Sequence, residues 1–150
     1  MSYACRQVSA SELPLLKAML AMFGEAFGEP DTYQGAVPDD AYLKRLLDKP
    51  SFIALAALNA GEVVGGLAAY ELEKFERARS EIYIYDLAVQ ADHRRKGVAT
   101  ALIRHLQQIA RDRGAYVIFV QADPGDDAAI RLYESLGTRE DVHHFDIPVV

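Results

Sequence analysis

The chain of 150 residues has no tryptophan, a single cysteine and no long hydrophobic run. Because Cys5 is alone, an internal disulfide is excluded and a reducing compartment is the default. No apolar stretch approaches the roughly 18 residues of a membrane helix, and the first residues lack the basic and apolar order of a secretion signal. We therefore expect a soluble cytoplasmic protein with no membrane partner.

Positive charge is also scarce, since 16 Lys and Arg face 22 Asp and Glu and the formal net charge is −6. A nucleic-acid partner would need a net basic surface, so this class of partner is excluded and a cationic ligand is favoured. The four histidines have no carboxylate or cysteine at ligand spacing. No metal site is expected.

The hydrophobic content of 51% is enough for one continuous core, and no repeat or linker-like segment divides the chain. We expect one domain over residues 1–150. Alternating strand and helix patterns predict the α/β class. The expected strands are residues 3–8, 52–58, 63–70, 81–89, 115–122 and about 142–147. Of these, the strand at 115–122 should be buried.

The expected helices begin at capping residues and end at Gly or Pro. One starts near Leu13 with Ser9 or Ser11 as its cap, and residues 24–33 should form its frayed end and a loop. Three more helices follow: from Asp39 or Asp40 to a stop at Pro50, from the 92–103 stretch through Arg113, and from Asp126 or Asp127 to Gly137.

Three adjacent cations precede Gly97, at the junction of a predicted strand and a predicted helix. Amide N–H groups at a helix start lack intrahelical acceptors and favour an anion, and Gly97 lets a phosphate approach the backbone. Neither Gly-x-Gly-x-x-Gly nor Gly-x-x-x-x-Gly-Lys-Ser/Thr is present, so the two familiar nucleotide loops are excluded. The alternative is a solvated basic turn in which the glycine only ends a segment.

The pattern Arg94-x-x-Gly97-x-Ala99 resembles the acetyl-CoA motif of the GNAT superfamily of N-acetyltransferases. Residues 114–123 with 129–137 resemble its second conserved block. More narrowly, residues 52–57, 79–89, 121–123 with 125–127, and 144–147 are similar to the aminoglycoside 3-N-acetyltransferases of the GNAT type, whereas Pro124 departs from that pattern; the resemblance covers roughly residues 20–147.

This resemblance implies the GNAT fold, a mixed central sheet with antiparallel N-terminal strands and a parallel, splayed pair at its centre, flanked by helices. It implies acetyl-CoA as the cofactor. The coenzyme contacts would come from the end of strand 81–89 and from the loop and helix start that follow: Leu87, Ala88, Val89, Arg94, Arg95, Lys96, Gly97, Val98, Ala99 and Thr100.

Two residues are candidates for proton transfer. Strand alternation puts Asp86 on the apolar face of Ile82 and Ile84 unless the strand bulges, and a partly desolvated carboxylate there suits a general base. The alternative is a structural carboxylate that holds the bulge. Tyr133 matches the tyrosine of the second GNAT block, which would protonate the departing CoA thiolate; from periodicity alone it is a core aromatic.

An aminoglycoside carries several ammonium groups, so its pocket should offer carboxylates and hydroxyls. The candidates are Glu81, Tyr83, Asp123, Asp126, Asp127, Glu140 and Asp146. Asp123 and Asp146 come first, because Asp126 and Asp127 can be helix caps and Glu140 can lie in a solvated turn.

The expected function is transfer of acetyl from acetyl-CoA to the 3-amino group of a gentamicin-like aminoglycoside, by direct attack in a ternary complex, which would confer resistance. The resemblance also implies a homodimer. Two alternatives stay open: a GNAT enzyme for another amine, such as a polyamine or a protein N-terminus, and an acyl-CoA-binding module without turnover.

Overall fold

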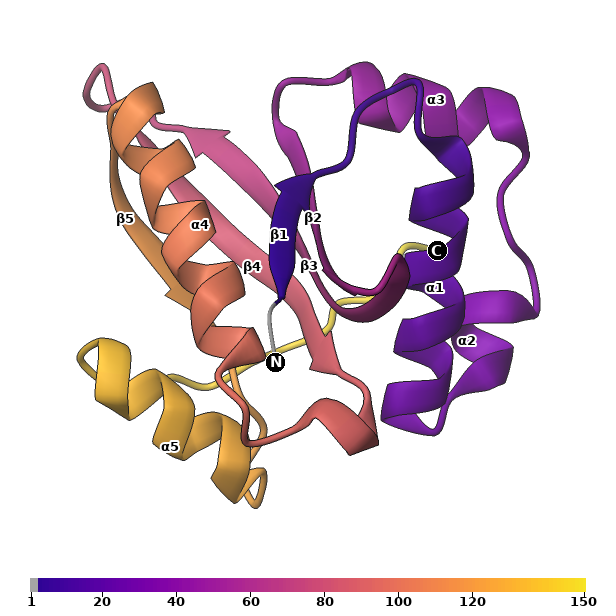
Figure 1. Ribbon diagram of the computed structural model, residues 1–150. Coiled ribbons are helices and arrows are strands. Elements are labelled where there is room, and N and C mark those ends of the chain that lie inside the picture. Colours follow the sequence, from indigo (N-terminus) through magenta and orange to yellow (C-terminus); the bar gives the residue numbers. More distant parts are fainter. Residues whose placement is uncertain (1–2) are drawn as a thin grey trace.

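A computed structural model describes residues 3–150 and contains one mixed sheet with the strand order β1-β2-β3-β4-β5 (Figure 1). β1 to β4 pair antiparallel, and β4 and β5 pair parallel. The strands are β1 (Ala4–Gln7), β2 (Phe52–Asn59), β3 (Glu62–Glu73), β4 (Ser80–Val89) and β5 (Ala115–Val120). The predicted α/β class and mixed sheet are confirmed. The predicted place of the parallel pair at the centre is wrong: the pair lies at one edge of the sheet, because no strand pairs with the other side of β5 within residues 3–150.

The helices lie on both faces of this sheet (Figure 1). They are α1 (Leu13–Phe27), α2 (Pro30–Gln34), α3 (Asp40–Asp48), α4 (Val98–Arg113) and α5 (Asp127–Leu136), and a 3-10 turn, η1 (Ala91–His93), precedes α4. α1 and α3 cover the face of β2 and β3, and α4 covers the opposite face. None of the helices within residues 3–150 combines the length and apolar character that a membrane span requires.

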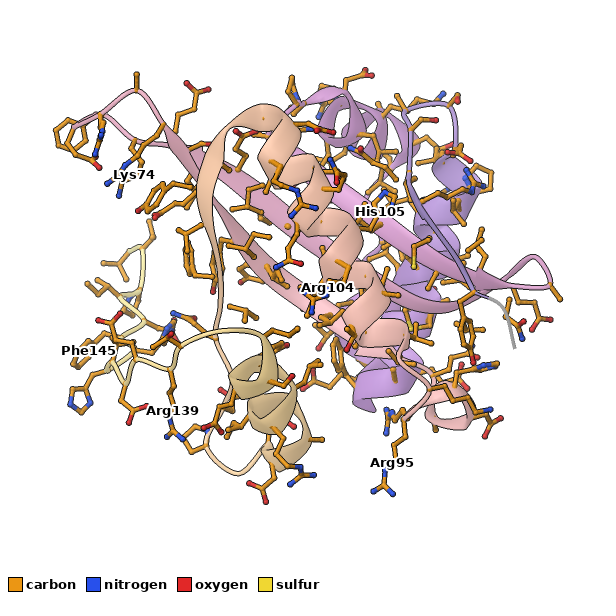
Figure 2. All side chains as sticks on the ribbon, turned by 60° about the vertical axis from the view of Figure 1, so that its left-hand side comes forward. Lys74, Arg95, Arg104, His105, Arg139 and Phe145 are labelled. Atoms are coloured by element: carbon orange, nitrogen blue, oxygen red, sulfur yellow. The ribbon has the colours of Figure 1, made fainter. Side chains whose placement is uncertain are left out.

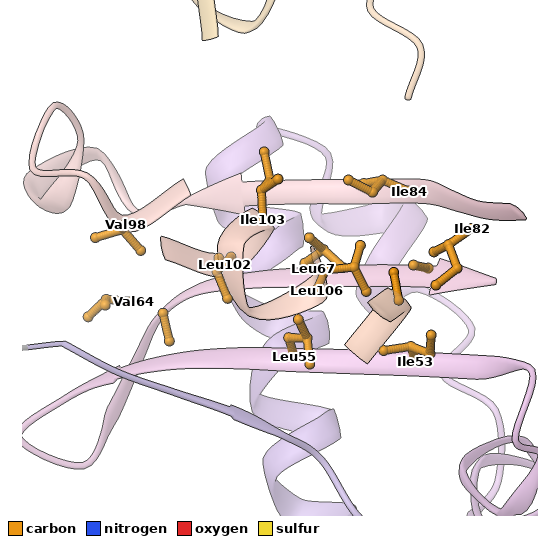
Figure 3. Packing of buried hydrophobic residues seen from close by; sticks show 13 residues of the cluster. Ile53, Leu55, Val64, Leu67, Ile82, Ile84, Val98, Leu102, Ile103 and Leu106 are labelled. Atoms are coloured by element: carbon orange, nitrogen blue, oxygen red, sulfur yellow. The ribbon is translucent and has the colours of Figure 1, made fainter. Parts of the chain in front are cut away.

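Each face has its own hydrophobic core. Under α4, Leu102 and Leu106 pack on the fully buried strand residues Ile53, Leu55 and Leu67 (Figure 3). Each such side chain contributes about 1.5–3 kcal/mol by leaving water. The second core, under α1 and α3, includes Met19, Met22, Phe23, Leu43, Phe52 and Ala54. The two cores pack against opposite faces of the central strands, and so they fix the position of β4.

A bulge divides β4 into two parts that face different cores. Ala68 of β3 pairs with Asp86 while Ala69 pairs with Ile84, so Tyr85 is the extra residue. Ile84 therefore faces the α4 side, whereas Ala88 lies in the core under α1. The bulge turns Asp86 away from the apolar α4 face, which is the exception to strand alternation that the sequence left open.

The predicted strand at 142–147 is wrong. Residues 138–150 form no strand, and every residue from Gly137 to Val150 is exposed. We call residues 138–150 the C-terminal arm. The predicted strand at 115–122 is confirmed over Ala115–Val120, but its predicted burial is wrong: β5 has β4 on one side and no strand on its other side in the described chain, so Tyr116 and Val117 are exposed.

The residues at the helix ends show which of the predicted caps form. Asp39 caps α3 by accepting from the Tyr42 amide at 2.9 Å, and Asp126 caps α5 by accepting from the Ala129 amide at 3.3 Å, as predicted. The predicted serine cap of α1 is wrong, because Glu12 occupies the cap position and no side chain caps it. Residues 24–33 are also more helical than expected, since α1 continues to Phe27 and α2 begins at Pro30.

Candidate active site

The two parallel strands separate where β5 ends. Their pairing stops at Ile84 and Val120, although β4 continues to Val89. A cleft of about 290 Å³ opens at this point. It is lined by Phe27, Tyr83, Ile84, Tyr85, Asp86, Leu87, Val120, Gln121, Ala122, Asp123, Asp126, Ala129 and Tyr133. The unpaired part of β4 therefore offers backbone groups to a ligand along its edge toward β5.

Asp86 lies in this cleft, half-buried, and the Tyr33 hydroxyl donates to its Oδ1 at 3.1 Å. Burial raises the pKa of Asp86, and the hydrogen bond from Tyr33 opposes that rise. The desolvated carboxylate therefore holds a proton more readily than a solvated one, which suits a group that must accept a proton near neutral pH.

Aromatic rings surround the carboxylate. Tyr83 stacks on Phe119 with ring centroids 4.6 Å apart, and its hydroxyl donates to Gln121 Oε1 at 2.9 Å. Tyr85 meets the rings of Tyr83 and Tyr70 edge-on. Such π faces attract ammonium groups, so the rings and the carboxylate favour the same kind of ligand.

Tyr133 lines the same cleft from α5 and packs against the core under α4. Burial, with a smaller contribution from the charge of Asp126, raises the pKa of Tyr133. Its hydroxyl therefore keeps its proton at neutral pH and can donate it. Asp86 comes to the cleft from the other side of the sheet. It follows the bulge in β4 and accepts a hydrogen bond from Tyr33 of α2, a helix on the same side of the sheet as α1.

The start of α4 fits a bound anion. Gly97 is the N-cap with φ +82°, no side chain caps this end, and a Cβ at Gly97 would meet no atom within 4 Å. The first intrahelical bond there is from the Ala101 amide to the Gly97 carbonyl, which leaves the amides of Val98, Ala99 and Thr100 as donors. A diphosphate group can reach these donors through open space.

The three cations of the loop differ in their surroundings. Arg94, predicted to face a phosphate, donates from Nε to the Val89 carbonyl at 3.0 Å and from Nη2 to the Ala26 carbonyl at 3.2 Å. It therefore ties the end of β4 to the end of α1. Arg95 and Lys96 are exposed, and Figure 2 shows Arg95 projecting from the loop before α4.

The predicted acidic residues do not all gather at the cleft. Tyr83, Asp123 and Asp126 line it, whereas Asp127 lies in the first turn of α5 and is exposed. Glu81, near the start of β4, accepts from the Tyr116 hydroxyl at 2.9 Å and lies 3.7 Å from Lys74.

The remaining two candidates, Glu140 and Asp146, lie on the exposed arm, and Asp146 contacts His144 at 2.8 Å. No group of three or more His, Cys, Asp or Glu side chains in residues 3–150 is arranged to hold a metal ion.

Sequence reasoning missed several residues of the cleft. Tyr33 fell in a segment that was expected to be a loop, and Tyr85 and Gln121 lie in stretches that resemble the family but were given no role of their own. The one usable signal for Tyr85 was the apolar strand face predicted for Asp86. A bulge that removes Asp86 from this face adds one residue to the strand next to it, and that residue is exposed.

The family comparison agrees with this geometry. The sequence profile of the family described as Acetyltransferase (GNAT) family matches residues 16–138. The chain belongs to the GNAT acetyltransferase family. The match includes β4, the α4 loop and α5, so all parts of the cleft fall within the family's conserved region. The resemblance to the superfamily is confirmed.

Two solved structures are similar to this GNAT chain over nearly its whole length. One is the aminoglycoside acetyltransferase HMB0005 from an uncultured soil metagenomic sample, 59% identical, covering 100% of both chains with a TM-score of 0.98. The other is the aminoglycoside acetyltransferase meta-AAC0020, also from an uncultured soil sample, in complex with sisomicin. It is 30% identical, with 99% of this chain and 97% of that chain covered and a TM-score of 0.92.

Curated relatives match over a shorter region. The rat (Rattus norvegicus) protein N-acetyltransferase family 8 member 2 is 33% identical over 89 residues, which are 59% of this chain and 39% of that protein. The human N-acetyltransferase 8 is 30% identical over 79 residues, 53% of this chain and 35% of that protein. The match thus spans about two fifths of the length of these relatives.

Proposed function

We propose that the protein transfers acetyl from acetyl-CoA to an amine of an aminoglycoside, in a ternary complex of both substrates, and so confers resistance. The specific acceptor is the 3-amino group of a gentamicin-like compound. The observation that carries the proposal is the position of Asp86: a half-buried carboxylate at the mouth of the β4–β5 cleft, turned by the bulge toward the α1 side.

The residues at the start of α4 suit the coenzyme. The amides of Val98, Ala99 and Thr100 would bind its diphosphate, and Arg95 and Lys96 would add charge beside it. The amides of Leu87 and Val89 lie on the part of β4 that extends beyond β5 and would bond the pantetheine arm. When bound, acetyl-CoA supplies the acetyl group as a reactive thioester.

Asp86 and Tyr133 would divide the proton transfers. An aminoglycoside amine is largely protonated at neutral pH, so Asp86 takes that proton, directly or through water, before the nitrogen can attack. Tyr133 would then donate its hydroxyl proton to the departing sulfur, and the second proton that the nitrogen loses as the amide forms would restore the hydroxyl. Burial supports both roles, because it raises the pKa of the carboxylate and of the phenol.

The wall of the cleft supports a polycationic acceptor. Asp86, Asp123 and Asp126 supply carboxylates and Tyr83 and Tyr85 supply π faces. A 30%-identical aminoglycoside acetyltransferase in complex with sisomicin agrees with this substrate class. Four of the predicted acceptor-binding residues do not line the cleft, so we assign them no contact with the acceptor there: Glu81, Asp127, Glu140 and Asp146.

The test is Asp86→Asn, with release of the CoA thiol measured for gentamicin, spermidine and a peptide with a free N-terminus. We expect wild type to turn over gentamicin and the variant to lose about 10²–10⁴ in kcat with CoA affinity retained, because only proton transfer is removed. Asp92→Asn, in the exposed turn η1, is the matched control. Equal kcat for Asp86→Asn and wild type removes Asp86 from the mechanism, and turnover of spermidine or the peptide alone moves the proposal to another amine.

Thermal unfolding shows whether the variant is folded. Because the pKa of Asp86 is raised in the folded chain, this group favours folding below its unfolded pKa, and that contribution is lost as pH rises through the folded pKa. At neutral pH the ionised carboxylate is therefore a cost. Asp86→Asn should melt no lower than wild type, and at most about 2–4 °C higher.

We also propose that the protein works as one domain, in the cytoplasm and as a homodimer. The free thiol of Cys5 agrees with a reducing compartment. Exposed apolar side chains such as Tyr116, Val117 and Phe145 agree with a partner subunit.

A further inference from the structure

A second cavity lies beside Asp86, between the sheet and the helices α1 and α3, and we call it the α1–α3 cavity. Its volume is about 180 Å³, and its wall consists of side chains from α1, α3, β2, β3 and β4 with Pro38. α1 and α3 lie on the sheet face opposite α4 (Figure 1). Pro38 and Tyr42 are exposed, so the cavity reaches the surface at these residues. The proposed acetyl transfer leaves this cavity without a role.

The wall of the α1–α3 cavity is apolar except at one point. Of the described residues that form it, Asp86 alone is charged, and the others are aliphatic or aromatic. The aromatic ones are Phe23, Tyr42, Phe52 and Tyr70, and the rings of Phe52 and Tyr70 lie 5.4 Å apart. Aromatic side chains receive a further ring edge-on or offset, with centroids about 4.5–7 Å apart. The wall therefore suits a ligand with an aromatic ring.

The size of the cavity fits one aromatic ring with a short chain. A dry apolar cavity of about 150 Å³ holds a benzene molecule, and the α1–α3 cavity has about 180 Å³. An unfilled apolar cavity deprives the atoms of its wall of dispersion contacts, so close-packed cores seldom keep one. Met19 and Leu43 in the same wall are only 1% and 3% exposed, so the core around the cavity is otherwise tightly packed.

Asp86 belongs to the wall of both the α1–α3 cavity and the cleft. Within residues 3–150, the hydrogen bond to its carboxylate comes from the Tyr33 hydroxyl and reaches Oδ1, and no cationic side chain influences the group. Oδ2 is therefore left to accept a hydrogen bond from a ligand. A half-buried carboxylate that lacks a cation binds an ammonium group through a charge-assisted hydrogen bond.

We propose that the α1–α3 cavity binds a small primary amine that carries one aromatic ring, with the ring in the cavity and the ammonium on Asp86. The simplest such ligand is 2-phenylethylamine, in which a short methylene chain joins the ring to the nitrogen. A sugar ring of an aminoglycoside does not fit this cavity, because its hydroxyls would find no hydrogen-bond partners along the apolar wall. The bound amine occupies Asp86, so it competes with an aminoglycoside amine for this carboxylate. The competition rests on the proposed function, whereas the binding itself does not.

The first experiment measures binding by calorimetry at neutral pH without coenzyme. Wild type should bind 2-phenylethylamine with a dissociation constant of about 0.1–1 mM, the range of a ligand of this size. The neutral analogue 2-phenylethanol should bind about tenfold more weakly, because it forms no charge-assisted hydrogen bond with Asp86. Asp86→Asn should bind the amine about as weakly as wild type binds the alcohol.

Two neighbouring leucines of α3 give a matched pair of variants. Both Leu46 and Leu47 are half-buried and pack on the core under α1 and α3, but only Leu46 lines the cavity. Leu46→Trp should weaken amine binding about tenfold or more, because the larger side chain fills the cavity, and Leu47→Trp should bind as wild type does. Thermal unfolding checks that both variants are folded. If Leu46→Trp does not fold, Leu20→Trp takes its place, since Leu20 lines the cavity from α1 and is also half-buried.

The second experiment measures competition, with acetylated gentamicin determined by mass spectrometry. 2-Phenylethylamine should raise the KM for gentamicin in wild type and leave kcat unchanged. If wild type does not acetylate gentamicin, the proposed function fails, and the calorimetry still decides on the cavity. No heat with the amine at about 10 mM, equal affinity for the amine and the alcohol, or unchanged affinity in the variant that fills the cavity would each overturn the inference.

Discussion

The pair of Tyr33 and Asp86 is the main feature of this protein at the residue scale. Two opposite influences act on one carboxylate: burial raises its pKa, and the hydroxyl of Tyr33, 3.1 Å away, lowers it. The balance between them decides at which pH Asp86 is ionised and able to accept a proton. Tyr33 is therefore expected to position and tune Asp86 without taking part in proton transfer itself.

Tyr33→Phe removes only the hydrogen bond that lowers the pKa of Asp86. The pKa of Asp86 should then rise further, and the acid limb of kcat/KM should move to higher pH by about 0.5–1 pH unit, the scale of one hydrogen bond. The measurement is kcat/KM for gentamicin against pH. Tyr116→Phe, whose hydroxyl bonds Glu81 at the other end of β4, is the control with an unchanged profile. A shift of the acid limb to lower pH would contradict this account.

At the scale of elements, the start of α4 follows the end of β4 closely in the chain, and we propose that both contact the coenzyme. Arg94 links them to α1 through the carbonyls of Val89 and Ala26. The left-handed backbone at Gly97 leaves the space above the first α4 amides open. This helix end therefore leaves its first amides open, in contrast to α3 and α5, whose N-termini are capped by the carboxylates of Asp39 and Asp126.

Gly97→Ala tests the helix end, and Gly61→Ala in the β2–β3 turn is its matched control. Both glycines have a left-handed backbone, with φ +82° and +84°, and neither has an atom within 4 Å of an added Cβ. Both variants should lose similar stability, about 1–2 kcal/mol, because an L residue is strained in this conformation.

Only Gly97→Ala should weaken CoA binding, by about tenfold, because its methyl group occupies the approach of the phosphate. Calorimetry with CoA measures the affinity, and thermal unfolding measures the stability. Equal CoA affinity in the two variants would show that the start of α4 does not bind the coenzyme.

At the scale of the whole molecule, two hydrophobic cores hold one sheet from opposite faces, and the cleft opens where β5 leaves β4. The formal net charge is −6, and Asp86, Asp123 and Asp126 line this opening, so we expect a negative field there. A field of this sign attracts a polycationic acceptor at long range, and salt screens it.

The salt dependence of turnover follows from this field. The kcat/KM for gentamicin should fall about five- to tenfold as ionic strength rises from about 0.05 to about 0.5 M, while kcat at saturation stays the same. Steady-state kinetics with saturating acetyl-CoA measures both constants. A salt-independent kcat/KM would mean that the acceptor is not recognised through charge.

Features that depend on neighbours a few residues apart could be predicted from the amino-acid sequence alone. The caps Asp39 and Asp126, the start of α4 after Gly97 and its end at Gly114, and the antiparallel β2–β3 pair all follow from spacing within one segment. The family motifs are of the same local kind. For this reason the fold class and the location of the cleft could be predicted.

Contacts between distant segments depend on the three-dimensional fold and could not be predicted in this way. Tyr33 reaches Asp86 across 53 positions and Arg94 reaches Ala26 across 68, and no periodicity within either segment encodes such contacts. The unpaired edge of β5 and the free arm were likewise hidden, because an apolar alternating segment shows that it can pair but not with which strand. Local hydrogen bonds and hydrophobic spacing act within a few residues, whereas strand partners and side-chain pairs depend on how the whole chain packs.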